Sequence, residues 1–287
     1  QDYKHDTGPY TIEQVVHVEA SWHHSKGKGV VEETQFIESL AFGVDTVKLG
    51  GIVATADPRD RNFKKILKLH HKASPHFRGI RKMASFHEDK QIHAWTDEPQ
   101  LYRNKKFLKG FEVLSQYNLS FDAWVYSTQL EDVIYLAKQF PETSIVLDHL
   151  GTPAGLFGPI GANTGMTQTA RENIFFRWKD DLAELASCPN VYTKMSGLFM
   201  PVLGHRFHKE GRLASKQEVF DLAHPMITHA LACFGTYRVM FASNFPMDSV
   251  STSLINIIDA LSDVVAAYDP DALERVFHHN AKQFYRL

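Results

Sequence analysis

The fold of this chain is decided by one stretch, Ile145-Val146-Leu147-Asp148-His149-Leu150-Gly151. Its three consecutive branched apolar residues are too few for the core of a helix, but they are typical of a strand that is covered on both faces. Two ionisable side chains and a glycine follow directly, so reactive groups lie where the strand ends. His149 is therefore either a functional residue or a core histidine that is hydrogen-bonded to a neighbour.

The composition is that of an ordinary globular protein. The 287 residues are 44% hydrophobic and 22% charged, with a formal net charge of −2, and we expect one domain over residues 1–287. No basic excess indicates a nucleic acid as partner, and no apolar run reaches the roughly 18 residues of a membrane helix. The two cysteines, Cys188 and Cys233, form no CxxC pair, which favours a reducing compartment and hence a cytoplasmic protein.

Six further strands are predicted around the opening stretch. They lie near residues 15, 47, 79, 121, 192 and 240. Helical periodicity occupies most of the intervals, as in the segment where Phe63, Ile66, Leu67 and His70 share a face. Helices are expected over residues 31–42, 63–70, 107–117, 130–140, 175–186, 220–234, 254–268 and 270–284, and the passages 84–104 and 151–165 have no regular period.

The alternation of strands and helices favours a parallel α/β barrel. No GxGxxG fingerprint or Walker loop indicates a nucleotide-binding open sheet. Because a closed barrel of this type needs eight strands, the count of seven predicts a (β/α)8 TIM-barrel-like fold whose first strand is missing from this chain or is not recognisable in it.

Charged and aromatic side chains lie at several strand ends. The Arg81 guanidinium suits a substrate carboxylate or lactone oxygen, and Lys194 suits the same group as a point charge. For each of them a structural ion pair is the alternative. Trp22, Trp124 and Tyr126 also follow strands, where aromatic walls shape pockets for rings; elsewhere we would assign them to the core.

Seven phrases of the sequence then form a recognisable set. In order along the chain they resemble the Amidohydrolase 2 family of TIM-barrel metal-dependent hydrolases, and most of all its lactonase branch, which includes L-fuconolactonase and 2-pyrone-4,6-dicarboxylate lactonase. The phrases are His17-Val18-Glu19-Ala20, Gly79-Ile80-Arg81, Phe121-Asp122 with Tyr126 and Gln129, Leu147-Asp148-His149-Leu150-Gly151, Lys194-Met195-Ser196-Gly197-Leu198, Phe241-Ala242-Ser243-Asn244-Phe245-Pro246, and Asn280-Ala281 before Phe284-Tyr285-Arg286-Leu287.

The resemblance implies positions for a metal and a base. In that family the first strand carries a His-x-His pair, the sixth a His and the eighth an Asp that acts as general base. If the strands are numbered from the missing one, His149 falls on strand six and Asn244 on strand eight. His149 is thus a tentative metal ligand, and one divalent metal, zinc or manganese, is the cofactor that the resemblance implies.

Two departures from the family pattern bear on the chemistry. No His-x-His pair occurs near the start, and a catalytic zinc usually needs three protein ligands, so either a ligand strand lies upstream of Gln1 or the site works without it. Asn244 stands where many relatives carry Asp, and an amide orients water or substrate but cannot act as a base. Asp248 substitutes as the base if the turn folds back; otherwise it caps the following helix.

The leading hypothesis is a hydrolase that opens a lactone or related cyclic ester of a sugar acid or an aromatic-degradation carboxylate. Arg81 and His149 would polarise the carbonyl oxygen, and Asp248 or Glu19 would help water to attack. The alternatives are a metal-dependent decarboxylase of the same superfamily and an inactive barrel retained as a binding protein. The expected partner is a small-molecule substrate, and assembly into a homo-oligomer is compatible with this prediction. The predicted catalytic residues are His149, Asn244 and Asp248, and the predicted substrate-binding residues are Glu19, Trp22, Arg81, Trp124, Tyr126 and Lys194.

Overall fold

The computed structural model describes residues 5–22, 27–44 and 46–287, and within them seven parallel strands form one curled sheet. The strands pair in chain order from first to last. All seven lie where the sequence predicts them, so the barrel-like α/β fold is confirmed. They are β1 (Gln14–Val18), β2 (Lys48–Thr55), β3 (Phe77–Arg81), β4 (Ser120–Ala123), β5 (Ile145–Leu147), β6 (Val191–Met195) and β7 (Val239–Phe241).

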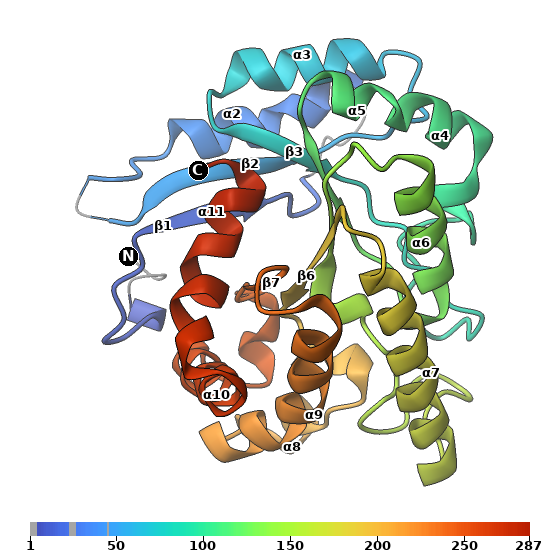
Figure 1. Cartoon of the computed structure of the whole chain (residues 1–287), viewed down its shortest axis with the longest axis vertical. Coiled ribbons are helices and arrows are strands. Elements are labelled where there is room, and N and C mark those ends of the chain that lie inside the picture. Colours follow the sequence, from blue (N-terminus) through green and yellow to red (C-terminus); the bar gives the residue numbers. More distant parts are fainter. Residues whose placement is uncertain (1–4, 23–26, 45) are drawn as a thin grey trace.

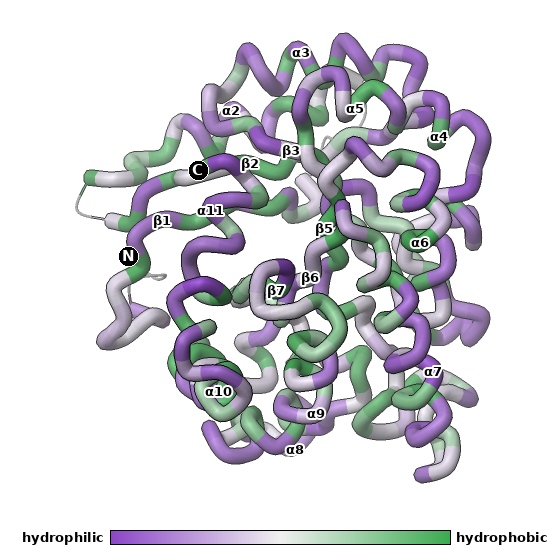
Figure 2. Tube along the Cα trace, viewed as in Figure 1, coloured by the Kyte–Doolittle hydropathy of each residue, from purple (hydrophilic) through white to green (hydrophobic). Residues whose placement is uncertain are grey.

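Helices cover the outside of the sheet (Figure 1). Hydrophobic and hydrophilic stretches alternate along outer helices such as α3 and α7 (Figure 2), as expected of helices with one buried face. In α3 the buried residues are the four that the periodicity places on one face. The helices are α2 (Glu32–Ser39), α3 (Phe63–Ala73), α4 (Lys105–Phe111), α5 (Val113–Gln116), α6 (Leu130–Gln139), α7 (Gln168–Ala186), α8 (Phe207–Glu210), α9 (Lys216–Phe234), α10 (Leu254–Tyr268) and α11 (Asn280–Tyr285).

The two faces of the sheet have different surroundings. The first and last residues of β5 belong to the large core under the helices, whereas Val146 between them belongs to a small inner core with Met240. Asp122 is the register partner of Val146, and Lys194 is that of Met240. Because register partners on adjacent strands point to the same side, charged side chains enter the space inside the curl.

The C-terminal residues fill the inner space where the strands begin. Phe284 and Tyr285 are buried in the inner core. Leu287 lies so close to Gly50 and Gly51 of β2 that a Cβ added at either glycine would stand 3.2 or 3.3 Å from its side chain. Figure 1 shows the C-terminus beside β2, with α11 leading to it. Within the described residues β1 and β7 are the two edges of the sheet.

Some helix boundaries differ from the predicted ones. Helix α7 begins at Gln168, earlier than the predicted start near residue 175. The prediction missed its first turns because they are largely exposed and carry no hydrophobic period. The helix expected over residues 270–284 is divided into a 3₁₀ turn at Pro270–Ala272, a π turn at Arg275–His279 and α11. Among the described helices, none has the length and hydrophobicity to cross a membrane.

Candidate active site

The turn after β5 has an unusual backbone. Residues 149–152 have φ values of 56°, 50°, 74° and 39°, and three of the four are not glycine. Each non-glycine residue held there costs on the order of 1–3 kcal/mol, so surrounding contacts must determine the conformation. The Trp178 indole donates to the Leu150 carbonyl at 2.7 Å, and the Trp124 indole donates to the Thr152 hydroxyl at 3.1 Å. The structure thus fixes a strained turn where the sequence predicts a functional histidine.

His149 is fixed by the two residues that follow β6. Its Nδ1 lies 2.8 Å from the Ser196 hydroxyl. Gly197 has a φ of 64°, and a Cβ at this position would lie 2.5 Å from the Cγ of His149. The Trp124 ring meets the imidazole edge to face, with 5.6 Å between the ring centroids. Only a glycine at position 197 therefore leaves room for the imidazole.

The imidazole of His149 is neutral at neutral pH. Burial lowers its pKa from 6.5 to about 4, and the nearby Arg81 and Lys194 also lower it while Asp148 opposes them. Its Nε2 has no hydrogen-bond partner among the described residues, yet it is not one of the fully buried unpaired atoms. A neutral imidazole with one nitrogen bound and the other accessible can donate to, or accept from, a ligand.

A buried charge network lies beside His149 and consists of Glu19, Arg81, Asp122, Asp148 and Lys194. Arg81 donates to Glu19 Oε1 at 2.8 Å and to Asp148 Oδ2 at 3.2 Å. Lys194 donates to Asp148 Oδ1 at 2.8 Å and to Asp122 Oδ2 at 2.5 Å. The most exposed side chain of the network, that of Arg81, is 11% exposed. The network therefore ties β3, β4, β5 and β6 together inside the curl.

The two aspartates of this network differ in their pKa values. Burial disfavours the charge of both. The pKa of Asp148 is nevertheless lowered to about 2, because Lys194 and Arg81 both face it. Burial raises the pKa of Asp122 to about 6 despite Lys194. Asp122 Oδ2 also accepts from the Tyr285 hydroxyl at 2.8 Å, whereas its Oδ1 has no partner. Asp148 is thus the permanently charged member beside His149.

Three predicted substrate-binding residues are members of this network. Arg81 and Lys194 both form the ion pairs that the sequence leaves as the alternative. The carboxylate of Glu19 also accepts from the Thr55 hydroxyl at 2.7 Å and from the Ser21 amide at 3.1 Å. Arg81 and Lys194 thus contact Asp148, directly before His149, and Glu19 is joined to it through Arg81.

The turn after β7 folds back on itself. The Asp248 amide donates to the Asn244 carbonyl at 3.2 Å, and the Asn244 side-chain amide donates to Asp248 Oδ1 at 2.8 Å. Asp248 does not cap α10, since Ser253 is the N-cap residue there. Burial raises the pKa of Asp248 from 3.8 to about 7, although Asn244 and the Phe199 amide lower it. A carboxyl group of this pKa exchanges a proton near neutral pH.

The predicted aromatic residues lie in different places. Trp124 contacts both the His149 ring and Trp95, the latter with 5.4 Å between ring centroids. Tyr126 donates from its hydroxyl to the His93 carbonyl at 2.7 Å. Trp22 packs against Phe36 of α2, with 5.1 Å between the ring centroids. Of the three, Trp124 is the one in direct contact with His149.

Sequence reasoning missed several residues that build this site. Ser196 and Gly197 stand in a quoted phrase, and their place directly after a strand was the available signal. Asp148 carries the same signal, because it directly follows β5, and Asp122 is a charged residue between the apolar residues of β4. Tyr285 reaches Asp122 across 163 positions of sequence, and no local pattern predicts that contact.

The described residues do not fit a zinc site. Over 5–22, 27–44 and 46–287 no three His, Cys, Asp or Glu side chains come together as a ligand set. The carboxylate nearest to His149 in sequence, Asp148, already receives hydrogen bonds from two cations. A catalytic zinc usually takes three protein ligands, and these residues provide no such set around His149.

One family model matches almost the whole chain, and several known sequences are similar to it. The family model described as Amidohydrolase matches residues 3–287. An uncharacterized protein of Sinorhizobium fredii, y4mH, is 29% identical over 290 residues, which cover 100% of this chain and 85% of that protein. An L-fucono-1,5-lactonase of Burkholderia ambifaria is 28% identical over 219 residues, which cover 74% of this chain but only 62% of the lactonase.

Solved structures show the same fold. A Burkholderia multivorans amidohydrolase with bound zinc has a TM-score of 0.74 at 20% identity, over 96% of this chain and 84% of that one. A Pseudomonas putida structure described as a 2-pyrone-4,6-dicarboxylic acid hydrolase has a TM-score of 0.65 at 16% identity, over 99% of this chain and 86% of that one. At these identities the likeness concerns the fold alone.

Proposed function

Because the chain belongs to the amidohydrolase family, as the match over residues 3–287 shows, we propose that it is a hydrolase that opens a lactone or a related cyclic ester. The substrate would be the lactone of a sugar acid or of a carboxylate from aromatic degradation. The relatives that are named L-fucono-1,5-lactonase support this reaction class, although the chain aligns with less than two thirds of their length.

The observation that carries the proposal is the fixed, neutral imidazole of His149. In the proposed ground state the Ser196 hydroxyl donates to Nδ1, so that the proton of the imidazole lies on Nε2. Nε2–H then donates to the carbonyl oxygen of the lactone and stabilises the oxyanion that forms there. Because its pKa is about 4, the imidazole stays neutral at neutral pH and needs no preceding deprotonation.

Asp248 is the proposed base that activates water. At neutral pH a substantial fraction of it is a carboxylate, because its pKa is about 7. It takes one proton from water while the hydroxide oxygen bonds to the carbonyl carbon, and it returns that proton to the ring oxygen when the ring C–O bond breaks. Asn244 holds the carboxylate through its contact with Oδ1. Glu19 is the weaker candidate, because its carboxylate is ion-paired with Arg81, whereas the contacts of Asp248 are with the uncharged amides of Asn244 and Phe199.

Three further predicted residues would support His149 and Asp248. Trp124 would form a wall for the ring of the substrate, since it already contacts His149. Arg81 and Lys194 would act as positioning residues that hold Asp148 and, through it, the turn that carries His149. No step of this mechanism passes through a metal, because the described residues do not form a ligand set for one.

The test is the rate of lactone opening by the purified protein. Acid release from a panel of sugar lactones and pyrone lactones is followed at constant pH, without added metal and with zinc or manganese. We expect turnover of at least one lactone, and a loss of about 10²-fold or more in kcat for His149→Ala and for Asp248→Asn. His71→Ala, which changes an exposed histidine of α3, is the control. If no lactone of the panel opens under any of these conditions, the proposal is wrong.

A further inference from the structure

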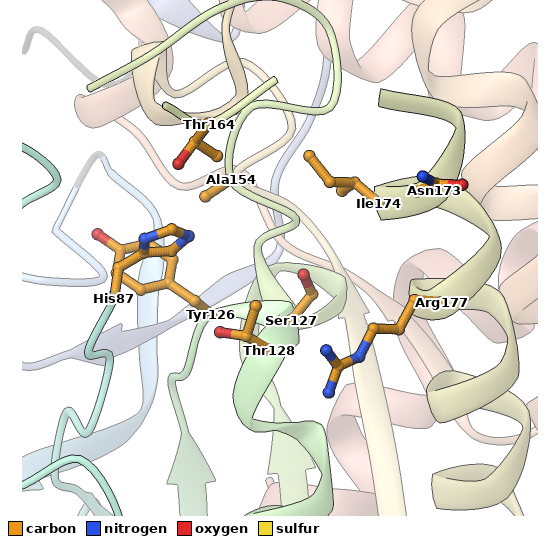
Figure 3. Close-up of a pocket in the computed structure, with 9 residues that line it drawn as sticks. All are labelled: His87, Tyr126, Ser127, Thr128, Ala154, Thr164, Asn173, Ile174 and Arg177. Carbon is orange, nitrogen blue, oxygen red and sulfur yellow. The ribbon is translucent and has the colours of Figure 1, made fainter. Parts of the chain in front are cut away.

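A hollow lies next to the turn after β5, where the Ser127 amide donates to the Thr152 carbonyl. Tyr126 is the one predicted substrate-binding residue that lines it, and the proposed catalytic residues His149, Asn244 and Asp248 do not. The volume of the hollow is about 190 Å³, and it is bounded by the passage after β3, the 3₁₀ turn Ser127–Gln129 before α6, the passage after β5 and α7. Figure 3 shows His87 and Tyr126 on one side, Ile174 and Arg177 of α7 on the other, and Ser127 and Thr128 between them.

The walls of this hollow are held by polar contacts. Gln129 donates from its amide to the carbonyls of Ala84 and Pro99, both at 2.9 Å, and accepts from the Phe86 amide at 2.8 Å. Asp89 accepts from the amides of residues 162 and 163, both at 2.8 Å. These contacts attach the passage after β3 both to α6 and to the passage after β5, so the hollow exists before a ligand arrives.

The lining has the chemistry of a site for a flat ring. Most of its surface is carbon, from the Tyr126 ring, Ala154 and Ile174. The His87 ring meets Tyr126 edge to face, with 5.8 Å between centroids. A cavity of roughly 150 Å³ lined by apolar side chains holds benzene, so 190 Å³ accommodates a six-membered ring with one substituent.

One cation stands at the rim of the hollow. The only ion pair of Arg177 among the described residues is with Asp181 of the same helix at 3.6 Å, and the Arg177 side chain is 60% exposed. Its other N–H groups are available for a carboxylate, which a guanidinium binds bidentately. In Figure 3 the guanidinium extends along the wall formed by Ser127 and Thr128.

We infer that this hollow binds a small planar ring that carries a carboxylate, with the ring between Tyr126 and Ile174 and the carboxylate on Arg177. The inference does not depend on lactone hydrolysis, since it uses none of His149, Asn244 or Asp248. It adds to the molecule a binding site for aromatic monocarboxylates beside the proposed active site.

Calorimetric titration with sodium benzoate tests the inference. Sodium acetate provides the charge without the ring, and benzamide provides the ring without the charge. We expect benzoate to bind one site at least about tenfold more tightly than either, and Arg177→Ala to weaken benzoate binding about tenfold. Lys138→Ala is the matched control: it also removes an exposed cation paired with an acid of α7, but it lies outside the hollow.

Several outcomes would overturn the inference. They are the absence of benzoate binding, equal affinity of wild type and Arg177→Ala, and equal weakening in Arg177→Ala and Lys138→Ala. Loss of benzoate binding in His149→Ala with full binding in Arg177→Ala would place the ligand in the proposed active site instead. Thermal unfolding of each variant shows that it is folded. Because lactone turnover is measured separately, failure of either proposal is recognised without the other.

Discussion

Replacement of Gly197 by alanine tests whether the backbone after β6 holds His149 in position. Gly197 has a φ of 64°, and the added Cβ would stand 2.5 Å from Cγ, 2.6 Å from Nδ1 and 2.9 Å from Cβ of His149. Carbon atoms in contact lie about 3.5–4.0 Å apart, so the imidazole must move by about 1 Å. That movement would break the 2.8 Å contact between Nδ1 and the Ser196 hydroxyl.

Two costs follow from this substitution. Holding alanine at a left-handed φ costs on the order of 1 kcal/mol or more, and the displaced imidazole adds about 1–3 kcal/mol of packing strain. A misplacement of about 1 Å at a reacting group lowers the rate by about 10²-fold. Gly211→Ala is the matched control, because Gly211 has a φ of 67° and no atom within 4 Å of the added Cβ.

Urea unfolding and initial rates of lactone opening measure both effects. We expect Gly197→Ala to lose about 2–4 kcal/mol of unfolding free energy and about 10²-fold in kcat. Gly211→Ala should lose on the order of 1 kcal/mol and keep its rate. If the two variants have the same stability and the same rate, the close approach of Gly197 to His149 does not position the imidazole and the reasoning is wrong.

Two further predictions concern buried charges. Asp248 has a pKa of about 7 in the folded protein against 3.8 ordinarily. Its contribution to the stability of the fold is therefore fully present below pH 4 and is lost as the pH rises through 7. Over that range the unfolding free energy of wild type should fall relative to that of Asp248→Asn by a few kcal/mol, on the order of 1.4 kcal/mol per pKa unit. Urea unfolding from pH 4 to 8 checks this, and parallel curves for the two proteins would contradict it. Lys194→Met leaves two aspartates buried without their shared cation and should cost about 3–5 kcal/mol. Lys216→Met removes a half-exposed cation 2.7 Å from Asp263 and should cost less than about 1 kcal/mol; equal losses in the two lysine variants would refute the role of burial.

The clearest strands could be predicted because they are short runs of apolar residues with turn residues beside them, as in β5 and β7. β5 shows this clearly: three apolar residues followed by charged ones leave a buried strand as the consistent interpretation. The structure refines that interpretation, since the strand ends at Leu147 and His149 lies in the turn beyond it.

The contacts of the site could not be predicted in the same way. Arg81 and Glu19 are 62 positions apart, and Arg81 and Asp148 are 67 apart. Pairing over such separations depends on how the sheet curls, which no local pattern records. The left-handed turn was also hidden, because Leu150 and Thr152 are not residues that ordinarily adopt positive φ. The turn is held by the hydrogen bonds of the two tryptophans, by the Ser127 amide on the Thr152 carbonyl and by the contact of His149 with Ser196, all of which form in the folded protein.

The central claim is that His149 presents a neutral imidazole with its proton on Nε2 to the lactone carbonyl. Nitrogen-15 NMR of the histidine side chains at pH 7, assigned with His149→Ala, measures this directly. We predict for His149 a neutral ring protonated on Nε2, with Nδ1 accepting from Ser196. A charged imidazolium at this pH, or a neutral ring protonated on Nδ1, would contradict the claim.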